Sequence, residues 1–331
     1  MKILVTGGAG FIGCNLVNRL VTEEGCEVVN LDKLTYAANL DALTAVQGDR
    51  RHIFEKVDLC DAEATFSVLR RHCPEAVVHL AAESHVDRSI RGPEVFVRSN
   101  IVGTFNLLEA CRKLWERKEL VDSFKFLHVS TDEVYGALGP GDPPFDETAA
   151  YDPRSPYSAS KAASDHLVRA WANTYGLPVV ITHSSNNYGP WQHPEKLIPV
   201  VIGSCLRRDR IPIFGTGDNV RDWMHVDDHL EALMLVLKGG ASGQTYDIGG
   251  ANEVSNLELA RRLCRLVDEL GPVDGSEGLI TLTSDRPGHD FRYAIDYSRI
   301  RDEFGWRPIV AFENGLRRTV EWYLERPDSL I

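Results

Sequence analysis

Tyr157 and Lys161 stand four residues apart in a segment that the sequence pattern predicts to begin a helix. One helical turn separates them, so the two side chains project from the same face. An ammonium group beside a phenol favours the phenolate and moves the phenol pKa down from about 10. Alone, such a pair is most often found on a protein surface. Near a binding site, it predicts a general base that removes a hydroxyl proton.

A second group of reactive side chains, Thr131, Asp132 and Glu133, follows the apolar segment 124–129, which predicts a strand. Parallel sheets bind ligands at the carboxyl ends of their strands. A threonine hydroxyl can share a proton with a phenol, while two adjacent carboxyl groups supply an acid and a base. The alternative is a loop whose carboxylates cap a helix. Together with Tyr157 and Lys161, the group favours catalysis of an elimination.

Three glycines, Gly7, Gly10 and Gly13, lie between the first predicted strand and the first predicted helix. Backbone without Cβ atoms can turn tightly and approach a pyrophosphate, whose charge the helix N-terminus stabilises. Asp32 ends the second predicted strand about 20 residues further on, where a carboxylate accepts both ribose hydroxyls and repels a 2′-phosphate. The motif therefore predicts NAD rather than NADP, with a solvated turn residue as the alternative for Asp32.

Asp58 ends the third predicted strand. It is a candidate partner for the adenine amino group of the cofactor. An equally compatible interpretation is that Asp58 caps a helix that begins at Ala62.

The elements that must position these residues follow from hydrophobic periodicity. Short apolar segments alternate with longer amphipathic ones, which is typical of βαβ units around a parallel sheet. Strands are predicted at 2–6, 27–31, 52–56, 76–79, 124–129 and 179–182, and helices at 11–21, 62–71 and 93–114. The predicted fold class is α/β, a Rossmann-type doubly wound parallel sheet with a smaller, mixed α/β substrate-binding lobe on the C-terminal side.

The alternation ends near Tyr188, beyond which prolines at positions 190, 194, 199 and 212 interrupt short segments. This region predicts a strand at 245–248, helices at 256–270 and 312–324, and a Gly/Asp/Glu-rich linker at 271–278. We expect an NAD-binding domain over residues 1–188, to which some later segments return, and a substrate-binding lobe over residues 189–331.

Composition excludes several classes of partner. The formal net charge of −12 disfavours nucleic acid and anionic membrane surfaces, because both attract contiguous positive charge. No apolar run approaches the roughly 18 to 20 residues of a membrane span. The seven cysteines are scattered without Cys-x-x-Cys spacing, and the histidines show no metal-ligand spacing. We expect reduced thiols, a cytoplasmic location and no metal.

Motifs in register along the chain carry a resemblance to a known family. Segments 6–13, 81–87, 130–136 and 157–161 resemble the extended short-chain dehydrogenase/reductase superfamily. Within it, segments 32–36, 131–133, 186–190, 194–199, 221–223 and 285–290 closely resemble the dTDP-glucose 4,6-dehydratase family. Epimerases of the superfamily generally lack a pair like Asp132 and Glu133. The resemblance extends from Met1 to about Leu324.

This resemblance implies an NAD-dependent lyase of deoxysugar biosynthesis, which converts dTDP-glucose into dTDP-4-keto-6-deoxyglucose and water. Oxidation at C4 would use Tyr157, and elimination across C5 and C6 would use Glu133 as base and Asp132 as acid. The catalytic candidates are Thr131, Asp132, Glu133, Tyr157 and Lys161. The cofactor-binding candidates are Gly7, Gly10, Phe11, Ile12, Gly13, Asp32, Lys33, Leu34, Thr35, Asp58, Leu59, Leu80, Ala81, Ala82, Ser84, Ser99, Tyr157, Lys161 and Asn187.

The resemblance also implies a set of substrate contacts, mostly in the second half of the chain. Among them, Lys196, Arg221 and Arg286 are cations, and a guanidinium can bind a diphosphate through two parallel hydrogen bonds. Any one of these cations alone would be a surface charge. The substrate-binding candidates are Ser84, Thr131, Asn186, Lys196, Leu197, Pro212, Ile213, Phe214, Arg221, Asn256, Asp285, Arg286, Pro287, Gly288 and His289.

We also expect a homodimer, which the resemblance implies as well. The helix patterns at 101–115 and 159–171 carry apolar residues on more than one face, enough to cover the sheet and leave a stripe for a partner. These residues are Ile101, Val102, Phe105, Leu108, Leu114, Ala159, Ala163, Leu167 and Trp171.

Two alternatives to this function remain at the level of sequence. One is another nucleotide-sugar enzyme of the superfamily, either a 4-epimerase or a dehydratase for UDP- or GDP-sugars. The other is a non-catalytic NAD-binding protein that has kept the fold. The presence of Asp132, Glu133, Tyr157 and Lys161 together disfavours the second alternative.

Overall fold

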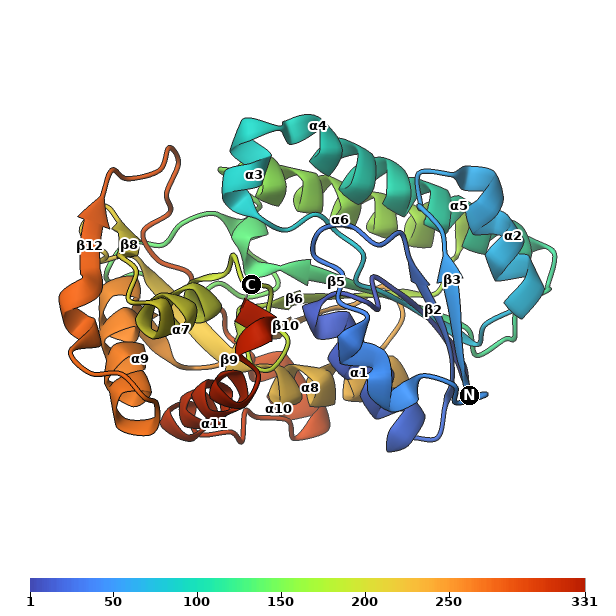
Figure 1. The fold of residues 1–331 in the computed structure, drawn as a ribbon. Coiled ribbons are helices and arrows are strands. Elements are labelled where there is room, and N and C mark those ends of the chain that lie inside the picture. Colours follow the sequence, from blue (N-terminus) through green and yellow to red (C-terminus); the bar gives the residue numbers. More distant parts are fainter. Residues whose placement is uncertain (331) are drawn as a thin grey trace.

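The computed structural model describes residues 1–330. A seven-stranded, entirely parallel sheet forms its centre, with the strand order β10-β6-β5-β4-β1-β2-β3 (Figure 1). The order reverses at β1, so the crevice beside the carboxyl ends of β1 and β4 is the expected ligand site of such a sheet. The strands are β1 (Lys2–Thr6), β2 (Glu27–Asp32), β3 (His52–Lys56), β4 (Ala76–His79), β5 (Lys125–Thr131), β6 (Val179–Ser184) and β10 (Thr245–Ile248).

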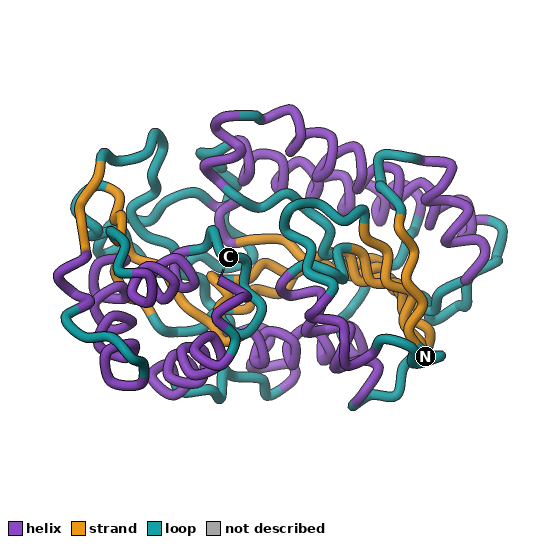
Figure 2. The backbone as a smooth tube through the Cα atoms, in the orientation of Figure 1, coloured by secondary structure: helices purple, strands orange, loops and turns teal. Residues whose placement is uncertain are grey.

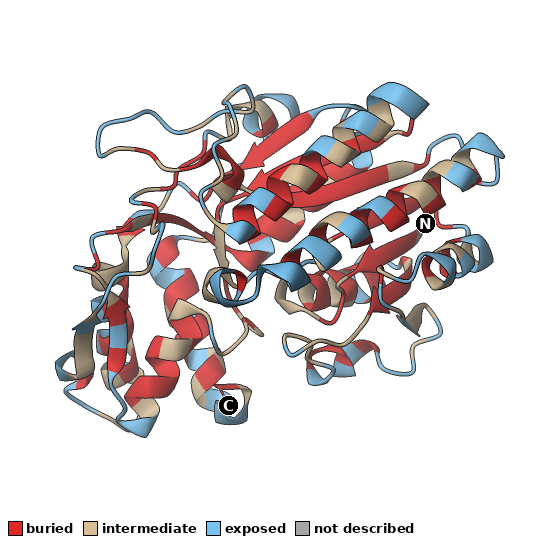
Figure 3. Ribbon diagram, turned by 90° about the horizontal axis from the view of Figure 1, so that it is seen from above, coloured by how far each residue is buried: buried red, intermediate tan, exposed pale blue. Residues whose placement is uncertain are grey.

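Helices cover both faces of this sheet, because its central strands are apolar on both sides. On one face lie α2 (Ala62–His72), α5 (Gly103–Glu116) and α6 (Pro156–Tyr175). On the other lie α1 (Phe11–Thr22), α8 (Val226–Gly239) and α10 (Ser298–Phe304). Figure 3 shows the strands buried between helices whose outer faces are exposed. The predicted Rossmann-type fold class is confirmed.

The prediction of one continuous helix at 93–114 is wrong, because the structure interrupts this helix with a π-helical turn. The chain forms α4 (Pro93–Phe96), a π-helical turn, η2 (Val97–Val102), and then α5. Asn100 in this turn is buried, and its amide group bonds to the backbone of Glu83 and, at 2.8 Å, to Ser160 Oγ. These long-range bonds to the loop after β4 and to α6 are invisible to helical periodicity.

The second half of the chain builds a smaller group of elements beside the large sheet, on the left in Figure 2. A three-stranded sheet joins β7 (Asn186–Tyr188), β9 (Val220–His225) and β11 (Glu253–Ser255), and a two-stranded sheet joins β8 (Ile211–Phe214) and β12 (Ile280–Thr283). Helices α7 (Leu197–Arg207), α9 (Asn256–Leu270) and α11 (Phe312–Glu325) pack around a separate apolar core. The late strand β10 lies in the large sheet, beside β6. The lobe boundary near Tyr188 itself stays a prediction.

Short elements connect these layers. They are η1 (Asp41–Val46), α3 (Val86–Arg91), η3 (Asp132–Tyr135), η4 (Ser276–Leu279) and η5 (Pro327–Leu330). The end of the predicted linker at 271–278 lies in η4, where Ser276 is buried and donates its backbone N–H to Asp268 on α9. Among residues 1–330, no helix is both long enough and apolar enough to cross a membrane.

Candidate active site

The glycine-rich turn between β1 and α1 makes close backbone contacts that only glycine permits. Gly7 has a φ of +72°, and a Cβ there would lie 2.7 Å from the Cα of Ala81. A Cβ on Gly13 would lie 2.1 Å from the carbonyl oxygen of Gly7. No side chain caps the N-terminus of α1 at Gly10. The first N–H groups of this helix therefore fit an incoming anionic group such as a pyrophosphate.

Asp32, at the end of β2, is held rigidly beside this turn. Its Oδ2 accepts the backbone N–H of Ala9 at 3.0 Å, and its Oδ1 accepts that of Leu34 at 2.8 Å. A carboxylate has about four acceptor positions, so both oxygens can still accept ribose hydroxyls. The nearby Lys33 ammonium is used within the chain, since it donates to Ser99 Oγ at 2.8 Å and lies 3.7 Å from Asp58 Oδ2.

Asp58 does not cap the following helix. The N-cap of α2 is Asp61, whose Oδ1 accepts the N–H of Ala64 at 2.9 Å. The Oδ1 of Asp58 accepts the N–H of Cys60 at 2.9 Å, its Oδ2 forms an ion pair with Lys33, and the residue lines the cavity described next. The capping alternative for Asp58 is therefore wrong.

A cavity of about 310 Å³ extends along the carboxyl ends of β1, β2, β4, β5 and β6. It is lined by every cofactor-binding candidate except Leu34, and also by Thr131, Asp132, Glu133, Asn186 and Lys196. Leu34 has a φ of +60° and packs against the apolar core under α1. The residues lining one end of the cavity, the glycine turn and Asp32, fit a dinucleotide, and the five catalytic candidates gather at its other end.

Tyr157 and Lys161 are both buried in the first two turns of α6, which Ser155 begins with a capping box. Lys161 Nζ donates to the carbonyl oxygen of Val129 at 2.9 Å, which anchors α6 to β5. Burial and the carboxylate of Glu133 raise the pKa of Tyr157, while a hydrogen bond with Thr131 lowers it. The pKa of Tyr157 is therefore raised, whereas the sequence predicted that Lys161 would lower it. Desolvation of the phenolate outweighs the other effects.

Asp132 and Glu133 begin η3, directly beyond the end of β5. Asp132 is 2% exposed, and burial raises its pKa well above the usual range, with further increases from Glu133 and Asp222. Thr131 Oγ1 lies 3.3 Å from Asp132 Oδ1. Burial also raises the pKa of Glu133, but Arg221 and Lys196 counteract this. Two carboxyl groups in such different surroundings are suited to separate roles as acid and base.

The substrate-binding candidates fall into two sets. Ser84, Thr131, Asn186 and Lys196 line the cavity, and Lys196 Nζ donates to the carbonyl of Ser84 at 2.9 Å. The others lie on α7, β8, β9, α9 and the loop that follows β12, outside the lining of the cavity: Leu197, Pro212, Ile213, Phe214, Arg221, Asn256, Asp285, Arg286, Pro287, Gly288 and His289.

Several members of this second set contact one another. The Arg286 guanidinium lies 5.0 Å from the ring centre of Phe214, and its Nη1 is 3.3 Å from Asp87 Oδ1. His289 Nδ1 is 2.6 Å from Asp285 Oδ1. These contacts join the loop after β12 to β8 and to α3.

Arg221 on β9 is fixed in place before any ligand arrives. Its side chain is almost fully buried, with Nη1 donating to the carbonyl of Val220 at 2.7 Å and Nη2 donating to that of Asp290 at 3.0 Å. The ring of Tyr293 lies 4.2 Å from its Cζ. The charge of Arg221 reaches the catalytic pair, since it lowers the pKa of Glu133.

Sequence reasoning missed some residues that line the cavity, namely Ser185, Gln192 and His193. Ser185 directly follows β6, which is two residues longer than predicted. Thr131 was selected because polar residues at the carboxyl end of a parallel strand are expected to bind ligands, and the same rule would have found Ser185. Gln192 and His193 lie in an irregular segment, where neither periodicity nor motif spacing carries a signal.

Comparisons with known proteins agree with this geometry. The sequence model of a family described as GDP-mannose 4,6 dehydratase matches residues 4–319. A dTDP-glucose 4,6-dehydratase of Neisseria meningitidis serogroup B is 54% identical, covering 98% of this chain and 93% of the relative. The crystal structure of DesIV, a dTDP-glucose 4,6-dehydratase from Streptomyces venezuelae with NAD bound, is 44% identical with a TM-score of 0.92, covering 99% and 98% of the two chains.

The same fold also supports other chemistry. A UDP-glucose 4-epimerase of Thermotoga maritima has a TM-score of 0.86 at 30% identity, covering 98% of this chain and 99% of that one. Fold alone therefore does not distinguish dehydration from epimerisation, and the decision rests on the side chains at the site.

Proposed function

The chain belongs to the GDP-mannose 4,6 dehydratase family, and from this premise we propose that it converts dTDP-glucose into dTDP-4-keto-6-deoxyglucose and water with NAD as cofactor. The observation that carries this proposal is the placement of Asp132 and Glu133 beside Thr131 and Tyr157 in one cavity. Epimerisation at C4 requires only removal and return of hydrogen at that carbon. The acid and base pair has a use only if water is eliminated.

The NAD-binding end of the cavity fits the cofactor through the glycine turn, the uncapped N-terminus of α1 and the carboxylate of Asp32. NAD, when bound, supplies a hydride acceptor that can later return the hydride, and a positive charge that favours the Tyr157 phenolate. Tyr157 then removes the proton of the C4 hydroxyl. Lys161, held by Val129, keeps α6 and its phenol against the end of β5.

Oxidation at C4 makes the hydrogen on C5 acidic, because the developing charge is shared with the ketone. Glu133 removes this hydrogen, and Arg221 and Lys196 favour its charged form. Asp132 stays protonated because it is buried, so it can donate a proton to the departing C6 hydroxyl. Water leaves, the hydride removed from C4 returns to C6, and a proton is added at C5. The two protons that Tyr157 and Glu133 accept equal the one that Asp132 gives to the departing hydroxyl and the one added at C5, so the protein and the cofactor both end unchanged.

Product mass tests this proposal most simply. Purified protein incubated with dTDP-glucose should yield a product lighter by one water, and UDP-glucose and GDP-mannose should give much less of any product. A 4-epimerase would give a product of unchanged mass. No turnover of any of the three sugars would support the non-catalytic alternative instead.

We also propose that the chain forms a homodimer through the outer faces of α5 and α6. Large apolar side chains are exposed along these helices and the neighbouring α4 and η2: Val95, Val97, Val102, Phe105 and Tyr175, each at least 41% exposed. The Phe105 ring packs edge-on against Trp171 at 5.7 Å. Leu108 and Leu114, from the set of apolar residues predicted to cover the sheet and leave a stripe, point into the core. An exposed apolar patch of this kind is typical of an interface.

Light scattering of the wild type and of Phe105→Asp tests the dimer. A charge in the centre of the patch should produce monomers at micromolar concentration, while Val121→Asp, at an exposed apolar residue outside these helices, should not. A monomeric wild type would contradict the proposal.

A cytoplasmic location remains part of the proposed function. All seven cysteines are free thiols within residues 1–330. Free thiols are maintained by the reducing conditions of a cytosol.

A further inference from the structure

A cluster of buried titratable residues that the proposed reaction does not use lies under the catalytic helix. Asp165 follows Lys161 by one turn of α6, so both residues face β5. Lys161 bonds to Val129, and Asp165 Oδ2 accepts from Ser130 Oγ at 2.9 Å. Asp165 thus lies next to the strand residues that lead directly into the catalytic segment.

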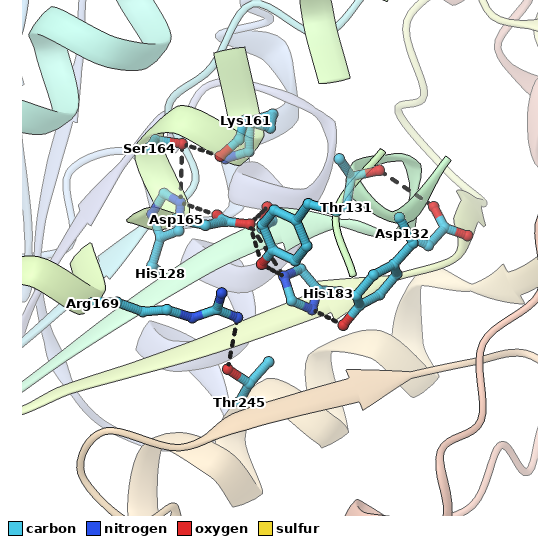
Figure 4. Close-up of polar contacts among 12 residues, drawn as sticks. His128, Thr131, Asp132, Lys161, Ser164, Asp165, Arg169, His183 and Thr245 are labelled. Carbon is cyan, nitrogen blue, oxygen red and sulfur yellow. Dashed lines mark hydrogen bonds and ion pairs between the residues drawn. The ribbon is translucent and has the colours of Figure 1, made fainter. Parts of the chain in front are cut away.

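The carboxylate of Asp165 is completely buried, and several donors surround it. Oδ2 lies 3.0 Å from the Tyr151 hydroxyl and 3.1 Å from His183 Nε2, while Oδ1 lies 3.1 Å from His128 Nε2. Figure 4 shows Asp165 lying between His128 and His183, with Lys161 and Ser164 on the same helix. A buried carboxylate strongly destabilises a protein unless a cation lies beside it.

His183 is placed to be that cation. It lies on β6, in register with Ser130 on β5 and with Asp247 on β10. Its Nδ1 is 2.9 Å from Asp247 Oδ1, and its Nε2 faces Asp165. Ionised carboxylates only accept hydrogen bonds, so an imidazole between two of them must donate from both nitrogens. That requires the doubly protonated, positively charged ring.

We propose that His183 is a positioning residue for the reaction: it holds a buried imidazolium between Asp165 and Asp247, and this charge offsets Asp165 beneath Tyr157 and Lys161.

The pKa shifts of these residues agree with this geometry. Burial alone would lower the pKa of His183, but the hydrogen bonds to Asp165 and Asp247 outweigh it and raise the pKa to about 9. Burial opposes ionisation of Asp165 too, yet the two histidines hold its pKa well below the usual range. His128 is different, because burial lowers its pKa to about 4, and it stays neutral.

The other charged or titratable groups that face His183 do not supply a positive charge between Asp165 and Asp247. From η3 and the loop before α6, the hydroxyls of Tyr135 and Tyr151 lie 2.8 and 2.9 Å from its ring nitrogens, and burial raises the pKa of both phenols. Burial raises the pKa of Asp247 on β10, while the hydrogen bonds from His183 and Tyr135 lower it and favour the carboxylate. Burial also raises the pKa of Glu147, which accepts the N–H of Asp247. The Arg169 guanidinium on α6 lies 5.1 Å from the Tyr151 ring centre and counteracts the rise in the pKa of that phenol, and its Nη2 donates to Thr245 Oγ1 at 3.3 Å.

The charges of Asp165 and His183 affect the ease with which Tyr157 loses its proton. The negative charge of Asp165 raises the pKa of Tyr157 and of Lys161. A neutral residue at 183 would leave that charge without compensation, so the phenolate would form only at higher pH. This step rests on the proposed function, in which Tyr157 is the base. One pKa unit corresponds to about a tenfold change in the fraction of phenolate at a fixed pH below the pKa.

Two measurements test the proposal, and the first does not depend on any reaction. Nitrogen NMR of histidine side chains in the NAD-loaded protein, with His183→Gln for assignment, should show His183 doubly protonated at pH 7 and His128 neutral. A neutral His183 ring at this pH would overturn the proposal. This result stands even if dTDP-glucose proves not to be the substrate.

The second measurement follows the rate of NADH formation on mixing with dTDP-glucose as a function of pH. In His183→Gln the acid limb should move to higher pH, with a loss of about tenfold at pH 7, and in Asp165→Asn it should move to lower pH. The double variant should lie near the wild type. Damage to folding alone would not move the two limbs in opposite directions, so shifts in the same direction, or none, would contradict the proposal. Absence of NADH formation in the wild type would instead count against the proposed function.

Discussion

The NAD end of the cavity and the substrate-binding candidates are built in different ways. At the NAD end, close backbone packing shapes the turn, since a Cβ on Gly7 would lie 2.7 Å from the Cα of Ala81 and a Cβ on Gly13 would lie 2.1 Å from the Gly7 carbonyl oxygen. Among the substrate-binding candidates outside the lining of the cavity, side chains from distant segments hold one another, as Arg286 does with Phe214 and Asp87. The NAD end should therefore fail when atoms are added, and this second group when charged groups are removed.

The largest effect is expected at the NAD end. Gly13→Ala places a methyl group against the Gly7 carbonyl, and forced displacement of a packed backbone costs about 1 to 3 kcal/mol. NAD affinity should fall at least about tenfold, because the turn that approaches the pyrophosphate must open. Bound NAD can be measured after purification. The matched control is Gly141→Ala, where a Cβ would meet no atom within 4 Å, and equal losses in both variants would contradict this description of the turn.

The sequence predicted the NAD end of the cavity more fully than the substrate end, because local motifs specify the first and contacts between distant segments build the second. Local motifs specify the glycine turn, Asp32 and the Tyr157 to Lys161 pair, so these residues could be placed in advance. Gln192 and His193 could not, because only the three-dimensional course of an irregular segment brings them to the cavity. The break in the helix at Asn100 was also missed, because its cause is a hydrogen bond to Ser160 on another helix.

The next effect is expected at the substrate end. Arg221→Ala removes a buried guanidinium that we expect to bind the diphosphate, and a charged hydrogen bond contributes about 1.5 to 3 kcal/mol. The KM for dTDP-glucose should rise roughly 10- to 100-fold while the NAD content stays the same. Steady-state kinetics and cofactor content measure the two quantities. Arg301→Ala, at an exposed residue on α10, is the control, and an unchanged KM in Arg221→Ala would remove Arg221 from the site.

A smaller effect is expected at Asp58 and Asp61, which lie three residues apart and should differ in what they stabilise. Asp61→Ala removes the N-cap of α2 and should cost about 0.5 to 2 kcal/mol of unfolding free energy without changing NAD affinity. Asp58→Ala should do the reverse, weakening NAD binding with little effect on unfolding. Denaturant titration and NAD titration of both variants give the comparison. Loss of stability in Asp58→Ala alone would restore the capping interpretation.

The central claim is that Asp132 and Glu133 make this site eliminate water rather than only exchange hydride at C4, and Glu133→Gln tests it most directly. The amide keeps the size of the side chain but cannot accept the C5 proton. Oxidation at C4 depends on Tyr157 and NAD, so NADH absorbance should rise on mixing with dTDP-glucose and then persist, whereas the wild type should show it only transiently. Exchange of the C5 hydrogen with solvent deuterium should fall in parallel. Normal turnover by Glu133→Gln, or loss of the initial oxidation, would contradict the assignment of Glu133 as the base.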